Sequence, residues 1–263
     1  MTAMLRLGLS ALNLTALAVP VTITAAAPVR TIAVIDLSRP FSARSPWRFT
    51  ATQGPEVEGL SGEPQDGRIA MCISNDQARS CLAGLNDSLV MGTGPDLFSE
   101  PHFLDKALLV HPSDAATLLL VQVASLPAMN GDQRSATLLF GYDRAKDRVS
   151  RVYAHVTGRN NNQEVRYVVK GILRGAVISA EPTRDAPFAF WVTVNRFVAP
   201  GRYTQVLRYR SATTYGDGNR LAVIDSEMPN IQQRLGLWRQ GQPLPLPDGG
   251  CVRPHLERDA LWC

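Results

Sequence analysis

Hydrophobic and polar residues alternate along much of this chain, and the clearest alternation lies in residues 187–197. In this section Phe188, Phe190, Val192 and Val194 fall on one face of an extended chain, and the residues between them fall on the other. A period of two is typical of a β-strand that buries one face. Residues 187–197 are therefore predicted to form a strand.

The wider section 134–225 has the same character. Short runs of β-branched and aromatic residues are separated by turn signals at Arg144–Asp147, Arg159–Asn162 and Tyr215–Asn219. Such short turns join neighbouring strands in antiparallel order. The section is predicted to be a meander of seven strands, at 136–142, 149–156, 165–169, 176–181, 187–197, 203–213 and 221–225.

Helix signals are scarce in the rest of the chain. Further strands are expected at 30–36, 47–53, 68–73, 106–111 and 116–125. One helix is predicted at 229–235, because Pro229 suits its first turn and Gly236 its end. The predicted fold class is all-β: an antiparallel meander forming a sandwich or jelly-roll-like domain, with one short C-terminal helix. A β-propeller is the alternative, although no repeat of fixed period supports it.

The first residues resemble a secretory signal peptide in layout. Met1–Arg6 carries one positive charge, residues 7–29 carry none, and Ala25–Ala27 supplies small residues for cleavage near Ala26. The uncharged run is long enough for a membrane anchor, but its scattered polar residues shorten the strongly apolar part. We expect export to the periplasm or the medium, and no membrane span in the mature chain.

The four cysteines agree with export. An even number in an exported chain suggests disulfides, and the spacings favour the pairs Cys72–Cys81 and Cys251–Cys263, with two other pairings possible. No C-x-x-C spacing occurs and the histidines are scattered, so no metal site is predicted.

These features predict three parts of the chain. They are a signal peptide at 1–26, an all-β domain at 27–247 and a disulfide-closed tail at 248–263. The tail follows Leu244–Pro247, whose prolines are typical of a stiff extended segment.

Arginines on the predicted sheet form the first candidate site. Arg208 and Arg210 are two residues apart and therefore share a strand face, and Arg166 and Arg174 lie on or near neighbouring strands. If the four converge, they would bind a carboxylate, a sulfate or an acidic sugar. The alternative is a solvent-exposed face on which the arginines pair with acidic residues.

Acidic residues near the ends of predicted strands form the second candidate site: Glu181, Asp185, Asp225 and Glu227. A pair of carboxyl groups supplies the acid and the base or nucleophile of glycoside cleavage. Helix capping and pairing with arginine are the simpler roles.

The remaining candidate side chains have structural interpretations. His155 lies opposite the apolar positions of its strand and is predicted to face solvent. Trp191 and Trp238 are predicted to pack in or against the core.

Composition and motifs limit the function classes. The formal net charge is only +4, and no run of like charges occurs, which argues against nucleic-acid binding. The chain has no G-x-S-x-G, H-E-x-x-H, P-loop or G-x-G-x-x-G sequence, so no cofactor is expected.

The leading hypothesis is an exported binding or envelope-associated protein whose ligand is an anionic glycan, a peptide or an envelope component. The alternative is an extracytoplasmic hydrolase that acts on glycans or esters through Glu181, Asp225 or Glu227. A third possibility is a purely structural part of an envelope assembly.

Overall fold

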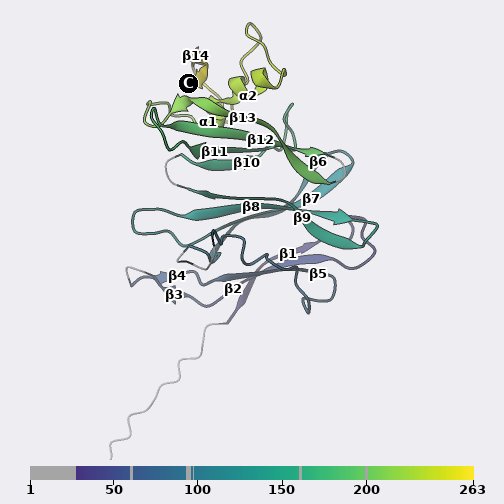
Figure 1. Ribbon diagram of the computed structural model, residues 1–263. Coiled ribbons are helices and arrows are strands. Elements are labelled where there is room, and N and C mark those ends of the chain that lie inside the picture. Colours follow the sequence, from purple (N-terminus) through teal and green to yellow (C-terminus); the bar gives the residue numbers. More distant parts are fainter. Residues whose placement is uncertain (1–27, 60–61, 93–95, 97, 160–161, 199–200) are drawn as a thin grey trace, which may run out of the picture.

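The computed structural model describes residues 28–59, 62–92, 96, 98–159, 162–198 and 201–263 (Figure 1). The expected signal peptide, residues 1–26, lies outside this range. The described elements are β1 (Arg30–Asp36), β2 (Arg48–Gln53), β3 (Val57–Glu58), β4 (Pro64–Gln65), β5 (Ile69–Ser74), β6 (Phe103–Ser113), β7 (Ala116–Ala124), β8 (Arg134–Asp143), β9 (Arg148–Gly158), β10 (Glu164–Tyr167), β11 (Val177–Pro182), β12 (Ala189–Val198), β13 (Arg202–Thr214), α1 (Val223–Ser226), α2 (Met228–Arg234), β14 (His255–Glu257) and β15 (Ala260–Trp262).

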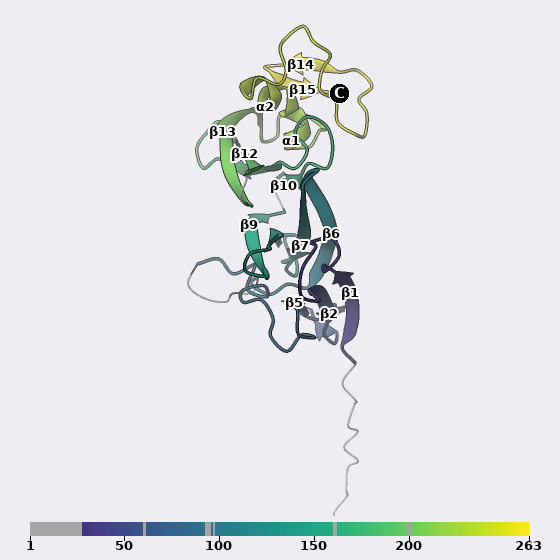
Figure 2. The ribbon, with the colours of Figure 1, turned by 90° about the vertical axis from the view of Figure 1, so that its right-hand side faces the viewer.

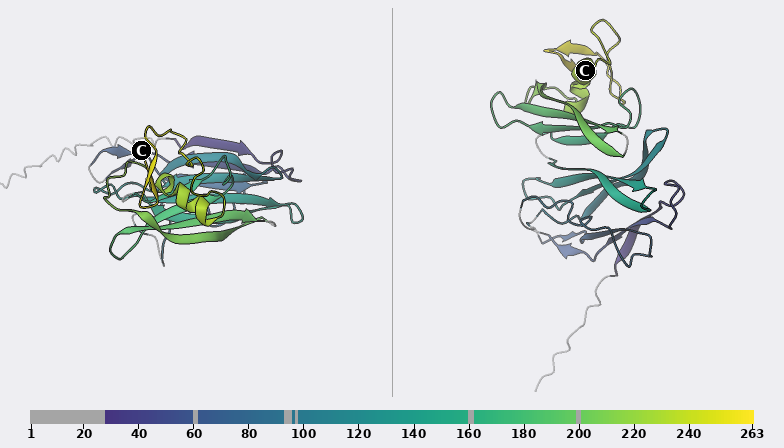
Figure 3. Two further views of the ribbon diagram at one scale, coloured as in Figure 1. Left: turned by 90° about the horizontal axis from the view of Figure 1, so that it is seen from above. Right: turned by 45° about the vertical axis from the view of Figure 1, so that its right-hand side comes forward.

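Three antiparallel sheets lie in layers, and the two helices cover the outer face of the last one (Figures 1 and 3). The first sheet has the strand order β1-β2-β5, the middle sheet β6-β7-β8-β9 and the third sheet β10-β11-β12-β13. The pairs β3–β4 and β14–β15 form separate two-stranded ribbons. The all-β antiparallel class is confirmed, and neither a closed barrel nor a propeller occurs among the described residues.

The middle sheet buries both of its faces. Leu119 and Val121 pack against the first sheet, while Leu118 and Leu120 pack toward the third. A strand that is buried on both sides needs apolar residues at consecutive positions, which explains the unbroken apolar run of β7. The stack therefore has one more sheet than the two layers of the predicted sandwich.

The third sheet packs its other face against the helices. Phe190, Val192 and Val194 of β12 lie in one apolar cluster with Ile224 and Ile231 of α1 and α2. The predicted alternation of this strand is thus confirmed over its buried positions.

Residues 221–225 were predicted as a strand, and this prediction is wrong, because α1 begins at Val223. The preceding turn directs the chain out of the sheet. Gly216 and Gly218 have φ angles of 77° and 86°, and the Asp217 carboxylate accepts the backbone N–H groups of Thr214 at 3.0 Å and Asn219 at 2.9 Å. The section 134–225 therefore holds six strands in two sheets.

The predicted helix is α2, and its bounds differ from the prediction by one residue at each end. Pro229 lies in its first turn, and Gly236, with φ of 71°, follows its end, as predicted. The helix α1 precedes it as an additional short element. Among the described residues, neither helix is long and apolar enough to cross a membrane.

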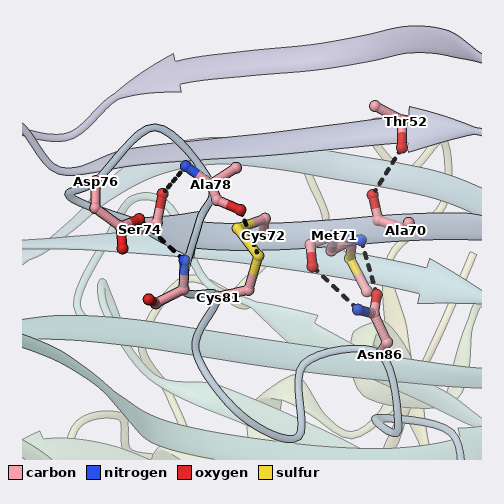
Figure 4. Close-up of a disulfide and its surroundings, with 10 residues drawn as sticks. Thr52, Ala70, Met71, Cys72, Ser74, Asp76, Ala78, Cys81 and Asn86 are labelled. Atoms are coloured by element: carbon pink, nitrogen blue, oxygen red, sulfur yellow. Dashed lines mark hydrogen bonds between the residues drawn. A yellow bond between two sulfur atoms is a disulfide. The ribbon is translucent and has the colours of Figure 1, made fainter.

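Both predicted disulfides are present. Cys72–Cys81 connects β5 to the loop that follows it, and Ala78 donates its N–H to Ser74 Oγ in the same loop (Figure 4). Cys251–Cys263 closes the C-terminal segment around β14 and β15. Figure 2 shows these two strands beside α1 and α2, far from β1 and β2.

A buried carboxylate joins the third sheet to α2. Glu227 is fully buried, and its Oε1 accepts the N–H and the Oγ1 hydroxyl of Thr213, each at 2.7 Å. Its Oε2 accepts the Tyr209 hydroxyl and the Asn230 amide, each at 3.0 Å. Burial raises the pKa of Tyr209, with the Glu227 charge as a further cause, so the phenol stays a donor. Four donors offset the loss of hydration that a buried charge suffers.

The same network extends to the C-terminal segment. Thr213 Oγ1 lies 2.8 Å from Ser226 Oγ, and the Asn219 amide donates to Ser226 Oγ and to the Leu261 carbonyl, each at 2.9 Å. Leu261 is fully buried. The segment closed by the second disulfide is thereby tied to the third sheet.

We predict that Glu227→Gln lowers the free energy of unfolding by about 3 kcal/mol, because the new amide group turns two N–H donors toward groups that themselves donate. Glu257→Gln, at an exposed position in β14, is the matched control and should change stability by less than about 0.5 kcal/mol. Urea unfolding at pH 7 measures both. Equal losses in the two variants would contradict the structural role of Glu227.

Candidate functional site

The contact between the middle and third sheets has an apolar part and a polar part. Val110, Leu139 and Val177 belong to the apolar part. In the polar part Gln122 donates to Thr137 Oγ1 at 2.9 Å across the middle sheet.

A close contact between an imidazole and a carboxylate connects the two sheets in the polar part. His155 Nε2 of β9 lies 2.5 Å from Glu181 Oε1 of β11. The prediction that His155 faces solvent is wrong, because the third sheet covers that side of β9 and leaves the imidazole only 25% exposed.

An aromatic side chain, Trp191, lies next to Glu181 on the same face of the third sheet. Trp191 of β12 lies directly opposite Glu181 on one side and Arg210 on the other. Residues in such register share a face of the sheet. The Arg208 guanidinium carbon lies 4.7 Å from the centre of the Trp191 ring, within the range of a cation–π interaction.

Of the two tryptophans that were predicted to pack in or against the core, Trp238 is buried at 6% exposure and Trp191 is 36% exposed. The sequence already placed Trp191 opposite the buried face of its strand. The sequence did not indicate how far the middle sheet extends over the face of β12 that carries Trp191.

We define the Trp191 surface by five residues of the middle and third sheets: His155, Glu181, Trp191, Arg208 and Arg210. The charged side chains of this surface have different partners. The contact with His155 keeps the pKa of the Glu181 carboxyl below its usual value, and the Arg208 charge acts in the same direction. Arg210 donates to the Asp185 carboxylate at 2.9 Å and to the Asp185 carbonyl at 3.0 Å.

Arg208 differs from Arg210 in its partners. Among the described residues its guanidinium contacts the Trp191 ring and has no hydrogen bond to a carboxylate or a carbonyl. Its donors are therefore free for a ligand, while the ring limits the positions that the side chain can take.

The other two predicted arginines lie elsewhere. Arg166 is on the helix side of the third sheet, where it donates to Asp225 of α1 at 3.1 Å and to Glu164 at 3.0 Å. Arg174 donates to the His111 carbonyl and to Asp114, each at 3.0 Å. The structure thus brings Arg208 and Arg210 together, but it does not bring Arg166 or Arg174 to the same surface.

The four candidate carboxylates lie in four different environments. Glu181 contacts His155, Asp185 binds Arg210, and Asp225 binds Arg166. Glu227 is fully buried, and both of its oxygens accept hydrogen bonds. The contacts of the described residues do not bring two of the four to one partner, as a pair acting on one glycosidic bond would require.

The described part of the chain contains no group of three or more histidine, cysteine, aspartate or glutamate side chains that would hold a metal ion. The Trp191 surface instead combines an aromatic ring, a guanidinium and a carboxylate. These groups suit a ligand with an acidic group and hydroxyls.

No protein-family model matches the chain, and neither the curated proteins nor the solved structures contain a match.

We predict that Glu181→Gln destabilises the protein by about 0.5 kcal/mol near neutral pH, a small effect because the Glu181 side chain is 41% exposed and solvent screens the pair. The folded-state pKa lies below the ordinary value of 4.5. The stabilisation is thus present above pH 4.5 and is lost as the pH falls through the folded-state pKa.

Urea unfolding of wild type and Glu181→Gln at a series of pH values from about 3 to about 7 tests this prediction. The difference in unfolding free energy between the two proteins should be largest at the upper end of this range and should shrink toward its lower end. Glu257→Gln serves again as the exposed control. A stability difference that does not change with pH would show that the carboxylate charge contributes nothing.

Proposed function

We propose that this protein is an exported binding protein whose Trp191 surface recognises an acidic saccharide that carries a carboxylate and hydroxyl groups. The observation that carries the proposal is Arg208, which is stacked on the half-exposed Trp191 ring without a carboxylate partner among the described residues. A guanidinium is a planar fork of donors that matches a carboxylate in two parallel hydrogen bonds.

The Trp191 ring contributes to affinity because it limits the motion of the Arg208 guanidinium. A free arginine side chain loses rotamer freedom when it binds, and that cost is smaller for a side chain already held in place. Trp191 also offers exposed apolar surface beside the guanidinium, against which the carbon-bound hydrogens of a sugar ring can pack.

The neighbouring groups favour a saccharide over a simple anion. Glu181 contacts His155 through Oε1, and its half-exposed carboxylate is an acceptor for ligand hydroxyls. Arg210 is already bound to Asp185, so of these two arginines only Arg208 lacks a hydrogen-bonded acidic partner among the described residues. A saccharide with one carboxylate on each ring and several hydroxyls fits this arrangement better than a densely charged polyanion.

Export is supported by the chemistry of the cysteines. All four form disulfides, which persist in oxidising compartments. The test is expression of the full chain in a bacterium followed by N-terminal sequencing of the exported protein. A start near Ala27 is the expected result, and recovery of Met1 in the membrane fraction would contradict export.

The ligand prediction is tested with trigalacturonate as the acidic probe and maltotriose as the neutral one, by isothermal titration calorimetry. Trigalacturonate should bind, and Arg208→Gln should weaken its binding about tenfold or more, since a charge-assisted hydrogen bond contributes about 1.5–3 kcal/mol. Arg208→Lys keeps the charge but loses the fork, so it should also weaken binding.

Arg239→Gln is the matched control, because Arg239 is an exposed arginine that follows α2. It should leave the affinity for trigalacturonate unchanged. Equal affinity for the two probes, or equal loss in Arg208→Gln and Arg239→Gln, would overturn the assignment of the Trp191 surface.

A further inference from the structure

A cavity of about 450 Å³ lies on the helix side of the third sheet. Its walls come from the loop 168–173 between β10 and β11, from α1 and α2, and from the segment 245–249. This volume falls in the range of small-molecule binding sites. The cavity is separate from the Trp191 surface, which lies on the opposite face of the same sheet.

Aliphatic side chains form part of the cavity walls. Val169, Ile172 and Leu246 line it and are 62%, 53% and 46% exposed. Large aliphatic side chains gathered around one hollow leave apolar surface in contact with water, which a ligand would cover favourably. Pro245 and Pro247 restrict the backbone of one wall, so that wall keeps its position without a bound ligand.

The charged groups of the cavity compensate one another. Arg166 and Asp225 form an ion pair there, and Lys170 Nζ lies 3.0 Å from Asp248 Oδ1. The described lining therefore carries two cations and two anions. An ionised ligand group beside the partly buried Arg166–Asp225 pair would have to break that pair or remain unpaired, and both are unfavourable. The Lys170–Asp248 pair is 68% and 74% exposed, so solvent screens it and its charges already compensate each other.

We infer that this cavity binds an unbranched aliphatic chain, with the polar end of the ligand left in solvent. The aliphatic side chains supply the apolar surface that such a chain would cover, and the compensated charges favour an occupant that is uncharged where it lies in the cavity. A free fatty acid or alcohol and the acyl chain of a lipid share this chemistry.

Three probes with a ten-carbon chain and different heads test the inference by calorimetry: 1-decanol below its solubility limit, and decanoate and decyltrimethylammonium below their critical micelle concentrations. All three should bind with affinities within about threefold of one another, because the head stays in solvent. Shortening 1-decanol to 1-octanol should weaken binding about tenfold, as expected for two fewer buried methylenes. Binding of decanoate alone, or of decyltrimethylammonium alone, would overturn the inference.

A fourth probe, monomeric dihexanoylphosphatidylcholine, distinguishes the acyl chain of a lipid from a free aliphatic molecule as the ligand. Its binding to the same site, shown by competition with 1-decanol, would extend the assignment to lipid acyl chains. Binding of the single-chain probes without it would assign the cavity to free chains. Both results support an aliphatic occupant.

The location is tested with Ile172→Asp and Leu246→Asp, which place a charge at exposed positions in two different wall segments. Each should reduce binding of 1-decanol at least tenfold, and Met129→Asp, at a position 90% exposed between β7 and β8, should not. Wild-type affinity in both wall variants would overturn the location. Trigalacturonate binding should persist in them, so failure of this inference is distinguishable from failure of the Trp191 surface.

Discussion

The organisation of the C-terminal half depends on one buried charge, the carboxylate of Glu227. Its two oxygens accept hydrogen bonds from Tyr209, Thr213 and Asn230, which lie on the third sheet and on α2. A carboxylate without such donors could not be buried at this depth. Because these bonds fix the helices on one face of the third sheet, only the opposite face remains for the middle sheet and for the Trp191 surface. Glu227, a weak candidate for a catalytic acid on the sequence alone, is fully buried and joins the third sheet to α2.

The layered arrangement also explains why the Trp191 surface exists. The middle sheet buries both faces, but its contact with the third sheet is apolar around Leu139 and Val177 and polar around His155 and Glu181. Where the contact becomes polar, side chains of the third sheet remain accessible, and Trp191 keeps 36% of its surface exposed. A sheet fully covered on both faces would have offered no such surface.

Two arginines of the third sheet differ in whether an acidic side chain of the protein binds them. Arg166 donates to Asp225 and Glu164, so its charge is neutralised within the protein. Arg208 lies against an aromatic ring and has no acidic hydrogen-bond partner among the described residues. The first contributes to a cavity with balanced charges, and the second offers an unpaired cation to a ligand. Both residues occupy strands of one sheet, but on opposite faces.

The sequence by itself determined the all-β class, nearly all of the larger strands, the helix that begins near Pro229 and both disulfides, because these follow from short-range periodicity, turn chemistry and cysteine spacing. Only the tertiary structure decided that residues 221–225 leave the sheet, that His155 meets Glu181, and that Arg166 and Arg208 point to different layers. Alternation along a strand tells which residues share a face, but it does not tell what covers that face. The covering layer is set by contacts between segments far apart in the chain, such as Arg166 and Asp225, and these long-range contacts leave no local pattern in the sequence.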